Sequence, residues 1–282
     1  MNDIKNYIEK NLELENFKFE NDANYKNIKN YYNNAKADAI HCYESIKGYL
    51  DKNKKILEVG GGIHLLTSFL SQEYDVTSVE PGGFTNYTDN LRNKILSKNN
   101  LKVVTTTLEN FKTNDKFDFI FSMNVLEHTI NIEEHLKSCM NLLRNNNSVL
   151  FILCPNYAFP FEGHFYKWFI PFLPKFTLTK IRKKQLIREF GLDTYQNIIG
   201  SLNFDCTYFK INKIKLPITF ENPLKNIFDR INIDPVFKRR LFQNAIIKNF
   251  YKIIIYTFLK KILINIYPVS LSPYLIMKIK KK

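Results

Sequence analysis

The sequence lacks the features of a secreted or membrane-spanning protein. Its four cysteines are scattered and form no C-x-x-C pair, which suggests neither a disulfide framework nor a zinc site. The longest uncharged stretch of its C-terminal part, residues 262–277, is interrupted by Pro268 and Pro273 and is short for a transmembrane helix. Since the first residues contain no apolar run typical of a signal peptide, we expect a cytoplasmic protein.

Acidic residues are missing from the last part of the chain. Residues 235–282 contain 11 Lys and Arg residues and no Asp or Glu, and the formal net charge of the whole chain is +14. A negatively charged partner is therefore expected to meet this tail. No nucleic-acid-binding module is recognisable, so we expect no specific nucleic-acid contact. Apolar residues at helical spacing leave two interpretations open: a peripheral contact with an anionic membrane through residues 236–282, or a helix packed on its own protein.

A glycine-rich turn follows a short apolar run. Residues 55–59 (Lys-Ile-Leu-Glu-Val) include Glu58 and lead directly to Gly60, Gly61 and Gly62, and an apolar helical pattern comes next. This order predicts a strand, a tight turn and a helix. Glycines allow positive φ angles and a close approach of the backbone to a ligand, and the start of a helix offers free N–H groups. The turn is therefore a candidate site for a nucleotide-like cofactor.

Four more apolar runs indicate alternating strands and helices. They span residues 75–79, 101–106, 117–122 and 148–153, and a helical pattern covers 132–143. This alternation predicts a parallel sheet with right-handed crossovers. Ligands of such sheets bind at the carboxyl ends of the strands. The residues predicted to lie at those ends are Glu80, Pro81, Leu108, Glu109, Asn124 and Asn156.

Together these motifs resemble the class I S-adenosylmethionine-dependent methyltransferases, within the broad methyltransferase-domain family. The matching stretches are ILEVGGG, TSVEP, TTLENF, FDFIFSMNVLEH and SVLFILCPN, which cover roughly residues 50–160. The resemblance implies an α/β, Rossmann-like, seven-stranded and mostly parallel sheet with helices on both faces. It also implies S-adenosyl-L-methionine as the cofactor.

The same resemblance implies a role for each residue of the cofactor site. Glu58 and Gly60–Gly62 would surround the methionine part, Glu80 would hold the ribose beside Pro81, Leu108 and Glu109 would lie by the adenine, and Asn124 would lie near the methionine amino group. The chain departs from the family at Thr107, where Asp is common. A nicotinamide dinucleotide is the rival cofactor, but its fingerprint requires a third glycine where this chain has Leu65.

The predicted organisation has four parts. Residues 1–50 form an N-terminal helical cap, and residues 51–212 form the cofactor-binding core. Residues 204–211 and 273–279 read as the sixth and seventh strands, which the family joins as a reversed hairpin. Because about sixty residues separate them here, far more than a hairpin loop needs, residues 213–271 are predicted to be a mainly helical, basic and apolar insertion that acts as a lid. Residues 272–282 would be the last strand and a basic tail.

Two histidines are candidate catalytic residues. A hydroxyl acceptor benefits from a base, most often His. His164 lies in an aromatic loop after the fifth strand and His128 follows the fourth strand, so both are expected near the carboxyl ends. Some RNA-end methyltransferases bind a cation through E-x-x-E-H, but Asn124 replaces the first carboxylate here. Because hard cations prefer several oxygen ligands, we expect no metal.

The acceptor is expected to be small or lipid-linked. The aromatic loop over residues 157–174 and the apolar lid favour a sizeable, partly apolar acceptor, such as the hydroxyl of a saccharide on a lipid carrier or a lipid or quinone precursor. The alternative is a non-catalytic protein of the same fold that binds the adenosyl cofactor or serves as a scaffold. The acidic and glycine positions of the cofactor motif are intact, which favours the enzyme.

Overall fold

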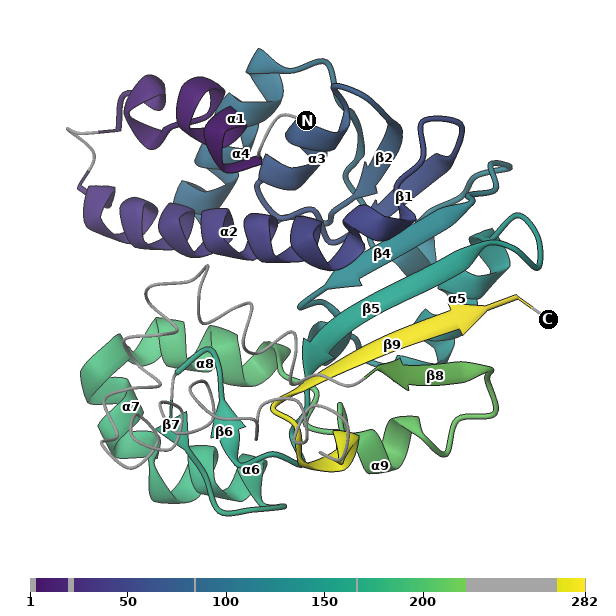
Figure 1. Cartoon of the computed structure of the whole chain (residues 1–282). Helices are drawn as coiled ribbons and strands as arrows, with labels where there is room; N and C mark the ends of the chain where they lie inside the picture. Colours follow the sequence, from purple (N-terminus) through teal and green to yellow (C-terminus); the bar gives the residue numbers. More distant parts are fainter. Residues whose placement is uncertain (1–3, 20–22, 84, 166, 222–267, 282) are drawn as a thin grey trace, which may run out of the picture.

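A seven-stranded, mostly parallel sheet forms the centre of the molecule (Figure 1). The computed structural model describes residues 4–19, 23–83, 85–165, 167–221 and 268–281. The strand order is β3-β2-β1-β4-β5-β9-β8, with β9 antiparallel to both of its neighbours. Its strands are β1 (Lys55–Val59), β2 (Asp75–Val79), β3 (Lys102–Val104), β4 (Phe119–Met123), β5 (Val149–Pro155), β8 (Ile218–Glu221) and β9 (Tyr274–Lys280). The predicted Rossmann-like, seven-stranded and mostly parallel sheet is confirmed.

Helices and short helical turns connect the strands. In chain order they are α1 (Ile4–Asn11), η1 (Leu14–Phe17), α2 (Tyr25–Ile46), η2 (Lys47–Tyr49), α3 (Leu65–Leu70), α4 (Asn86–Lys98), η3 (Leu108–Asn110), η4 (Leu126–His128), α5 (Ile132–Leu142), α6 (Pro174–Phe176), the π-helical turn η5 (Thr177–Ile181), α7 (Lys183–Phe190), α8 (Leu192–Ser201), α9 (Tyr208–Ile211) and η6 (Val269–Leu271). No helix within the described ranges is both long and apolar enough to cross a membrane.

Each central strand is buried on both faces. Successive side chains of a strand point to opposite sides of the sheet. Phe119 and Phe121 of β4 therefore pack into the cluster formed with α1–α4, whereas Ile120 packs into the cluster that contains α5. In β5, residues 151 and 153 likewise pack into the first cluster, and residues 150 and 152 pack into the second. This double burial explains why the strands are nearly continuous apolar runs.

A smaller body lies below the carboxyl ends of the strands in Figure 1. It contains the hairpin of β6 (Phe161–Glu162) and β7 (Lys167–Trp168), followed by α6, η5, α7 and α8. Its own apolar cluster is centred on Phe165, Leu178, Leu186 and Tyr195. The body faces the N-terminal helices across the ends of the sheet, and it places the β6–β7 hairpin opposite the cofactor motif.

The prediction of a sixth strand over residues 204–211 is wrong. The Thr207 side chain accepts a hydrogen bond from the Lys210 N–H at 3.3 Å and caps α9, which occupies the end of that segment. The sheet instead takes β8, which pairs antiparallel with β9. This strand falls inside the segment 213–271, for which we predicted mainly helix. Residues 222–267, which hold most of the predicted lid, lie outside the described part of the chain.

Asn156 joins three segments at the end of β5. Its side chain is buried, with Nδ2 donating to the carbonyls of Ser270 (3.1 Å) and Ser272 (2.8 Å). Its Oδ1 accepts from the N–H groups of Ala158 (3.2 Å) and Tyr208 (3.1 Å). All four hydrogen-bonding positions of the amide are therefore used. The side chain holds the start of the smaller body against the entry to β9.

We expect Asn156→Ala to lower the free energy of unfolding by about 1–3 kcal/mol or more, the cost of leaving buried backbone groups without partners. Urea unfolding measures the difference. The exposed Asn114 offers a matched control, for which the change to Ala should stay within about 0.5 kcal/mol. Equal stabilities of the two variants would contradict the bridging role of Asn156.

Candidate active site

The glycine turn and Glu80 form one hydrogen-bonded unit. Glu80 is buried, and its two carboxylate oxygens accept hydrogen bonds from the N–H groups of Gly62 and Gly82, each at 2.8 Å. Gly60 and Gly62 have φ angles of +81° and +55°, which favour glycine. A side chain at Gly60 would also collide with Val125. The carboxylate therefore fixes the turn after β1 and the turn after β2 relative to each other.

Glu58 lies in the middle of β1 beneath this turn. It accepts a short hydrogen bond from the Thr67 hydroxyl at the start of α3. Burial raises the pKa of its carboxyl to about 7, although hydrogen bonds from Thr67 and Ser78 partly offset the effect. Gly61 must be glycine because a Cβ there would lie 2.4 Å from the Ser78 Oγ. The turn is thus packed from below by polar groups.

Glu109 and Leu108 lie on η3, after β3. Leu108 is buried, and the Glu109 Oε1 lies 2.8 Å from Nδ1 of His135 on α5. Burial opposes ionisation of Glu109, but the His135 contact outweighs it and leaves the pKa of the carboxyl below its usual value. The exposed Pro81 and the half-buried Asn124, the latter with a φ of +55°, complete this wall. The Asn124 N–H donates to the Leu153 carbonyl at 2.9 Å.

All the predicted cofactor residues line one large cavity of about 1330 Å³. Drug-sized ligands usually occupy 300–1,000 Å³, so the cavity has room for a cofactor and part of a second molecule. Its lining includes the glycine turn, Glu80, η3 and Asn124 on one side. On the other side it includes Glu127, His128, His164 and part of α8.

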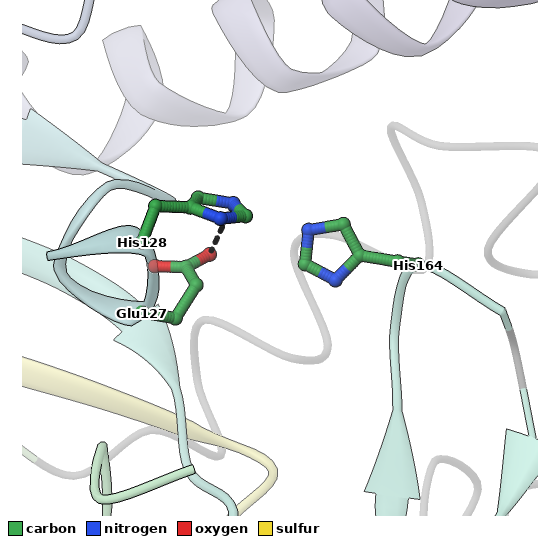
Figure 2. A group of neighbouring side chains, drawn as sticks. All are labelled: Glu127, His128 and His164. Carbon is green, nitrogen blue, oxygen red and sulfur yellow. Dashed lines mark ion pairs between the residues drawn. The ribbon is translucent and has the colours of Figure 1, made fainter. Parts of the chain in front are cut away.

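The two predicted catalytic histidines meet on this second side. His128 belongs to η4 after β4, whereas His164 comes from the β6–β7 hairpin (Figure 2). Their ring centroids are 5.1 Å apart at an interplanar angle of 81°. Glu127 lies next to them, with its Oε1 4.0 Å from Nε2 of His128. Residues from two separate elements, η4 and the β6–β7 hairpin, thus converge on one point of the cavity lining.

Glu162 holds His164 from behind. This fully buried carboxylate lies 2.6 Å from the His164 Nδ1, and it also accepts from the N–H groups of His164 (3.0 Å) and Phe165 (2.6 Å). Burial lowers the pKa of His164, but the Glu162 charge outweighs it and raises the pKa to about 9. For His128, burial and the charge of His164 lower the pKa to about 4. The neutral imidazole of the pair is therefore His128.

Sequence reasoning missed Glu162 and the contribution of α8. Glu162 is the only acidic residue between Glu134 and Glu189, and it stands two positions before His164 in an apolar, aromatic loop. An isolated carboxylate in such surroundings is a signal that could have identified it. The α8 residues Thr194, Asn197 and Ser201 carry no such signal, because only the packing of the smaller body turns them toward the cavity.

A family model described as "Methyltransferase domain" matches residues 30–207. The chain belongs to this methyltransferase family. The match confirms the family recognised from the motifs, the enzyme class and S-adenosyl-L-methionine as the cofactor.

Two similar curated sequences are uncharacterized proteins of Mycobacterium tuberculosis, MT1557 of strain CDC 1551 / Oshkosh and Rv1509 of strain H37Rv. Each is 33% identical over 156 residues, which is 53% of this chain and 51% of the relative. The chain therefore spans about half the length of the curated relatives it matches.

Solved structures similar to the chain include three methyltransferases. Coclaurine N-methyltransferase bound to N-methylheliamine and SAH is 15% identical, with a TM-score of 0.48 over 88% of this chain and 71% of that one. The plantazolicin methyltransferase BpumL is 16% identical, with a TM-score of 0.45 over 93% and 92%. An S-adenosylmethionine-dependent methyltransferase from Clostridium acetobutylicum ATCC 824 is 16% identical, with a TM-score of 0.38 over 56% and 61%.

The residues on the side of the cavity that holds the glycine turn and Glu80 fit the cofactor. A Cβ built on Gly62 meets nothing closer than the Tyr31 hydroxyl at 4.0 Å, so the turn opens onto free space where a ligand can approach the backbone. A buried carboxylate such as Glu80 still has lone pairs for ribose hydroxyls after accepting two N–H groups. When bound, the cofactor supplies the methyl group on a sulfonium. The chain supplies the binding and the orientation.

We expect Glu80→Ala to weaken binding of S-adenosylhomocysteine by about 1–3 kcal/mol, the usual cost of removing a charged hydrogen-bonding partner. Part of the loss would come from the ribose contact and part from loosening of the Gly62 turn. Isothermal titration calorimetry gives the affinity, and the exposed Glu73→Ala is the control. Unchanged affinity in a folded Glu80→Ala protein would exclude Glu80 from the site.

Proposed function

We propose that the protein methylates a hydroxyl of a lipid-linked or otherwise partly apolar acceptor, which it meets at an anionic membrane surface. The observation that carries the proposal is the continuity of the cavity: cofactor residues line one side, and Glu127, His128 and His164 line the other. An acceptor between the two walls would be close to the reacting methyl group. Holding two reactants in line supplies most of the catalysis in such a reaction.

The acceptor side of the cavity continues onto an apolar surface. Phe161 lines the cavity, and its ring lies 5.4 Å from the ring of Trp168, which is 41% exposed. In the described part of the chain, eight of the ten exposed large apolar side chains lie between residues 168 and 209. Those of the first segment are Trp168, Ile170, Phe172, Leu173, Phe176 and Ile181. We name residues 167–184 the apolar–basic surface.

Charge on this surface has one sign. Residues 163–188 contain seven Lys and Arg residues and no Asp or Glu. Lys175, Lys180, Lys183 and Lys184 are exposed. Exposed aromatic and aliphatic side chains among lysines are typical of proteins that lie on anionic membranes. The tail over residues 235–282 has the same sign of charge, and like charges favour a shared anionic partner over mutual packing.

The membrane contact predicts salt-sensitive binding to vesicles. The full chain should co-sediment with vesicles of phosphatidylserine and phosphatidylcholine more strongly than with phosphatidylcholine alone, and high salt should reduce the difference. Because each Lys near the surface contributes about 1 kcal/mol, loss of two such charges alone weakens binding roughly 30-fold. Lys183→Glu combined with Lys184→Glu also adds repulsion from the anionic surface and should weaken binding by more than this.

The matched charge control changes Lys112 and Lys116 to Glu. Both lysines are exposed and follow η3 in the sequence. A second pair of variants tests the apolar part: Phe172→Ser should reduce binding, whereas Val104→Ser on the opposite edge strand β3 should not. Equal, negligible sedimentation with both vesicle types would overturn the membrane contact and would favour a free small acceptor.

The two histidines are proposed to act on the acceptor. Transfer of a methyl group to the oxygen of a hydroxyl would require that hydroxyl to lose its proton. His128, the neutral imidazole of the pair, is the candidate acceptor of this proton, and His164 lies beside it on the wall that would face the hydroxyl. His164→Ala and His128→Ala should each lower methyl transfer by about 10²–10⁴-fold with nearly unchanged S-adenosylhomocysteine affinity.

Turnover can be followed with methyl-labelled S-adenosylmethionine and a cellular lipid extract, with mass spectrometry of the labelled product. If both variants keep full turnover, positioning alone accounts for the reaction. If label enters only water-soluble molecules, the acceptor is not a lipid.

A further inference from the structure

Glu127, His128 and His164 together have the geometry of a metal-binding site. One ligand atom from each residue lies within 4.8 Å of the ligand atoms of the other two. The residues come from two elements, η4 and the β6–β7 hairpin, that approach the same point from opposite sides (Figure 2). All three line the cavity, so the point between them can be reached from it.

Among the described residues, Glu127 accepts no hydrogen bond that would explain its burial, and its nearest basic partner is His128 at 4.0 Å. The residue is fully buried, and neither carboxylate oxygen accepts a hydrogen bond from another residue in the described part of the chain. A buried carboxylate is costly unless a cation or hydrogen bonds compensate for the lost water. Figure 2 shows this carboxylate turned toward His128. A carboxylate that accepts no hydrogen bond therefore lies beside the two imidazoles.

His164 is held in the manner of a metal ligand. Its Nδ1 lies 2.6 Å from Glu162, which is itself fixed by two backbone N–H groups. With Nδ1 engaged, Nε2 is the nitrogen left for a metal ion, which would displace the Nε2 proton to water. Metal-binding histidines commonly have their other nitrogen bonded to a carboxylate, which sets the tautomer and the ring orientation. Glu162 fits this outer position.

We propose that Glu127, His128 and His164 bind a divalent first-row transition metal ion, such as Zn²⁺ or Co²⁺. Imidazole nitrogens favour these ions over Mg²⁺ and Ca²⁺, which prefer oxygen ligands. Three protein ligands leave coordination positions open toward the cavity. The prediction of no metal considered only the segment around Asn124, where one carboxylate is missing. The third ligand comes instead from 36 residues further along the chain than His128.

Binding of the metal ion does not depend on the acceptor's identity. The ion's role in the reaction rests on the proposed hydroxyl acceptor. If it holds, the two imidazoles serve the reaction as ligands instead of as bases. A cation there would lower the pKa of an acceptor hydroxyl, and the proton would leave to water.

Calorimetric titration of the chelator-treated full chain with Zn²⁺ tests the site. One ion per chain is expected, with Mg²⁺ much weaker. Glu127→Gln and His164→Asn should abolish measurable binding, whereas Glu162→Gln should weaken it by about 10–100-fold. His135→Asn, a buried histidine of the same cavity that contacts Glu109, is the matched control and should bind Zn²⁺ like the unmodified protein.

Two further measurements keep the result interpretable. The absorption spectrum of bound Co²⁺ should lack thiolate bands. Such bands would instead indicate that the ion binds to Cys154 and Cys206, whose sulfurs are 3.5 Å apart. Calorimetry with S-adenosylhomocysteine and thermal unfolding check that each variant is folded. The proposal is overturned if protein that binds S-adenosylhomocysteine takes up no Zn²⁺, or if Glu127→Gln and His164→Asn both bind it as tightly as the unmodified chain.

Discussion

Three buried carboxylates line one cavity, a fourth lies directly behind its wall, and the rest of the site is arranged around them. Glu58, Glu80, Glu127 and Glu162 are each at most 5% exposed. An ionised carboxylate away from water is costly unless donors or cations replace the water. The protein meets this cost differently at each one. Glu80 accepts two glycine N–H groups, and Glu162 accepts two N–H groups and faces a histidine.

The other two carboxylates have weaker compensation. Glu58 has hydroxyl donors, and Glu127 has no hydrogen-bonding partner from another described residue. Burial raises the pKa of both carboxyls to about 7. This difference in compensation matches the positions of the four carboxylates in the site. Well-compensated carboxylates fix the turn and the hairpin, whereas the less compensated ones lie where a cationic cofactor or a metal ion would supply the missing charge.

The two walls of the cavity have different origins. The cofactor wall consists of turns at the ends of parallel strands, and the register between β1, β2 and β4 sets their positions. The proposed acceptor wall combines η4, which follows β4, with the smaller body, whose apolar cluster is separate from the two clusters of the sheet. Since only this body carries the apolar–basic surface, the acceptor side can vary while the cofactor side stays the same.

Local sequence patterns were sufficient where structure depends on burial within a single strand. Residues 55–59 and 75–79 form β1 and β2 with the predicted bounds, because strands covered on both faces are apolar runs. Residues 204–211 misled the same reasoning. The segment alternates apolar and polar residues, but the Cys206 carbonyl and the Tyr208 N–H bond to Tyr157 and Asn156 rather than to a neighbouring strand. The true edge strand, β8, is four residues long and follows Pro217, so its pattern is weak.

The sequence by itself determined the parallel sheet, the cofactor turn and the position of Glu80, because each follows from residues that are close in the chain or at matching strand ends. Only the tertiary structure decided that Glu162 would anchor His164 and that His164 would face Glu127 and His128. Those contacts join η4 to a hairpin outside the sheet. No periodicity in the chain records them, since they depend on how the smaller body packs against the end of β5.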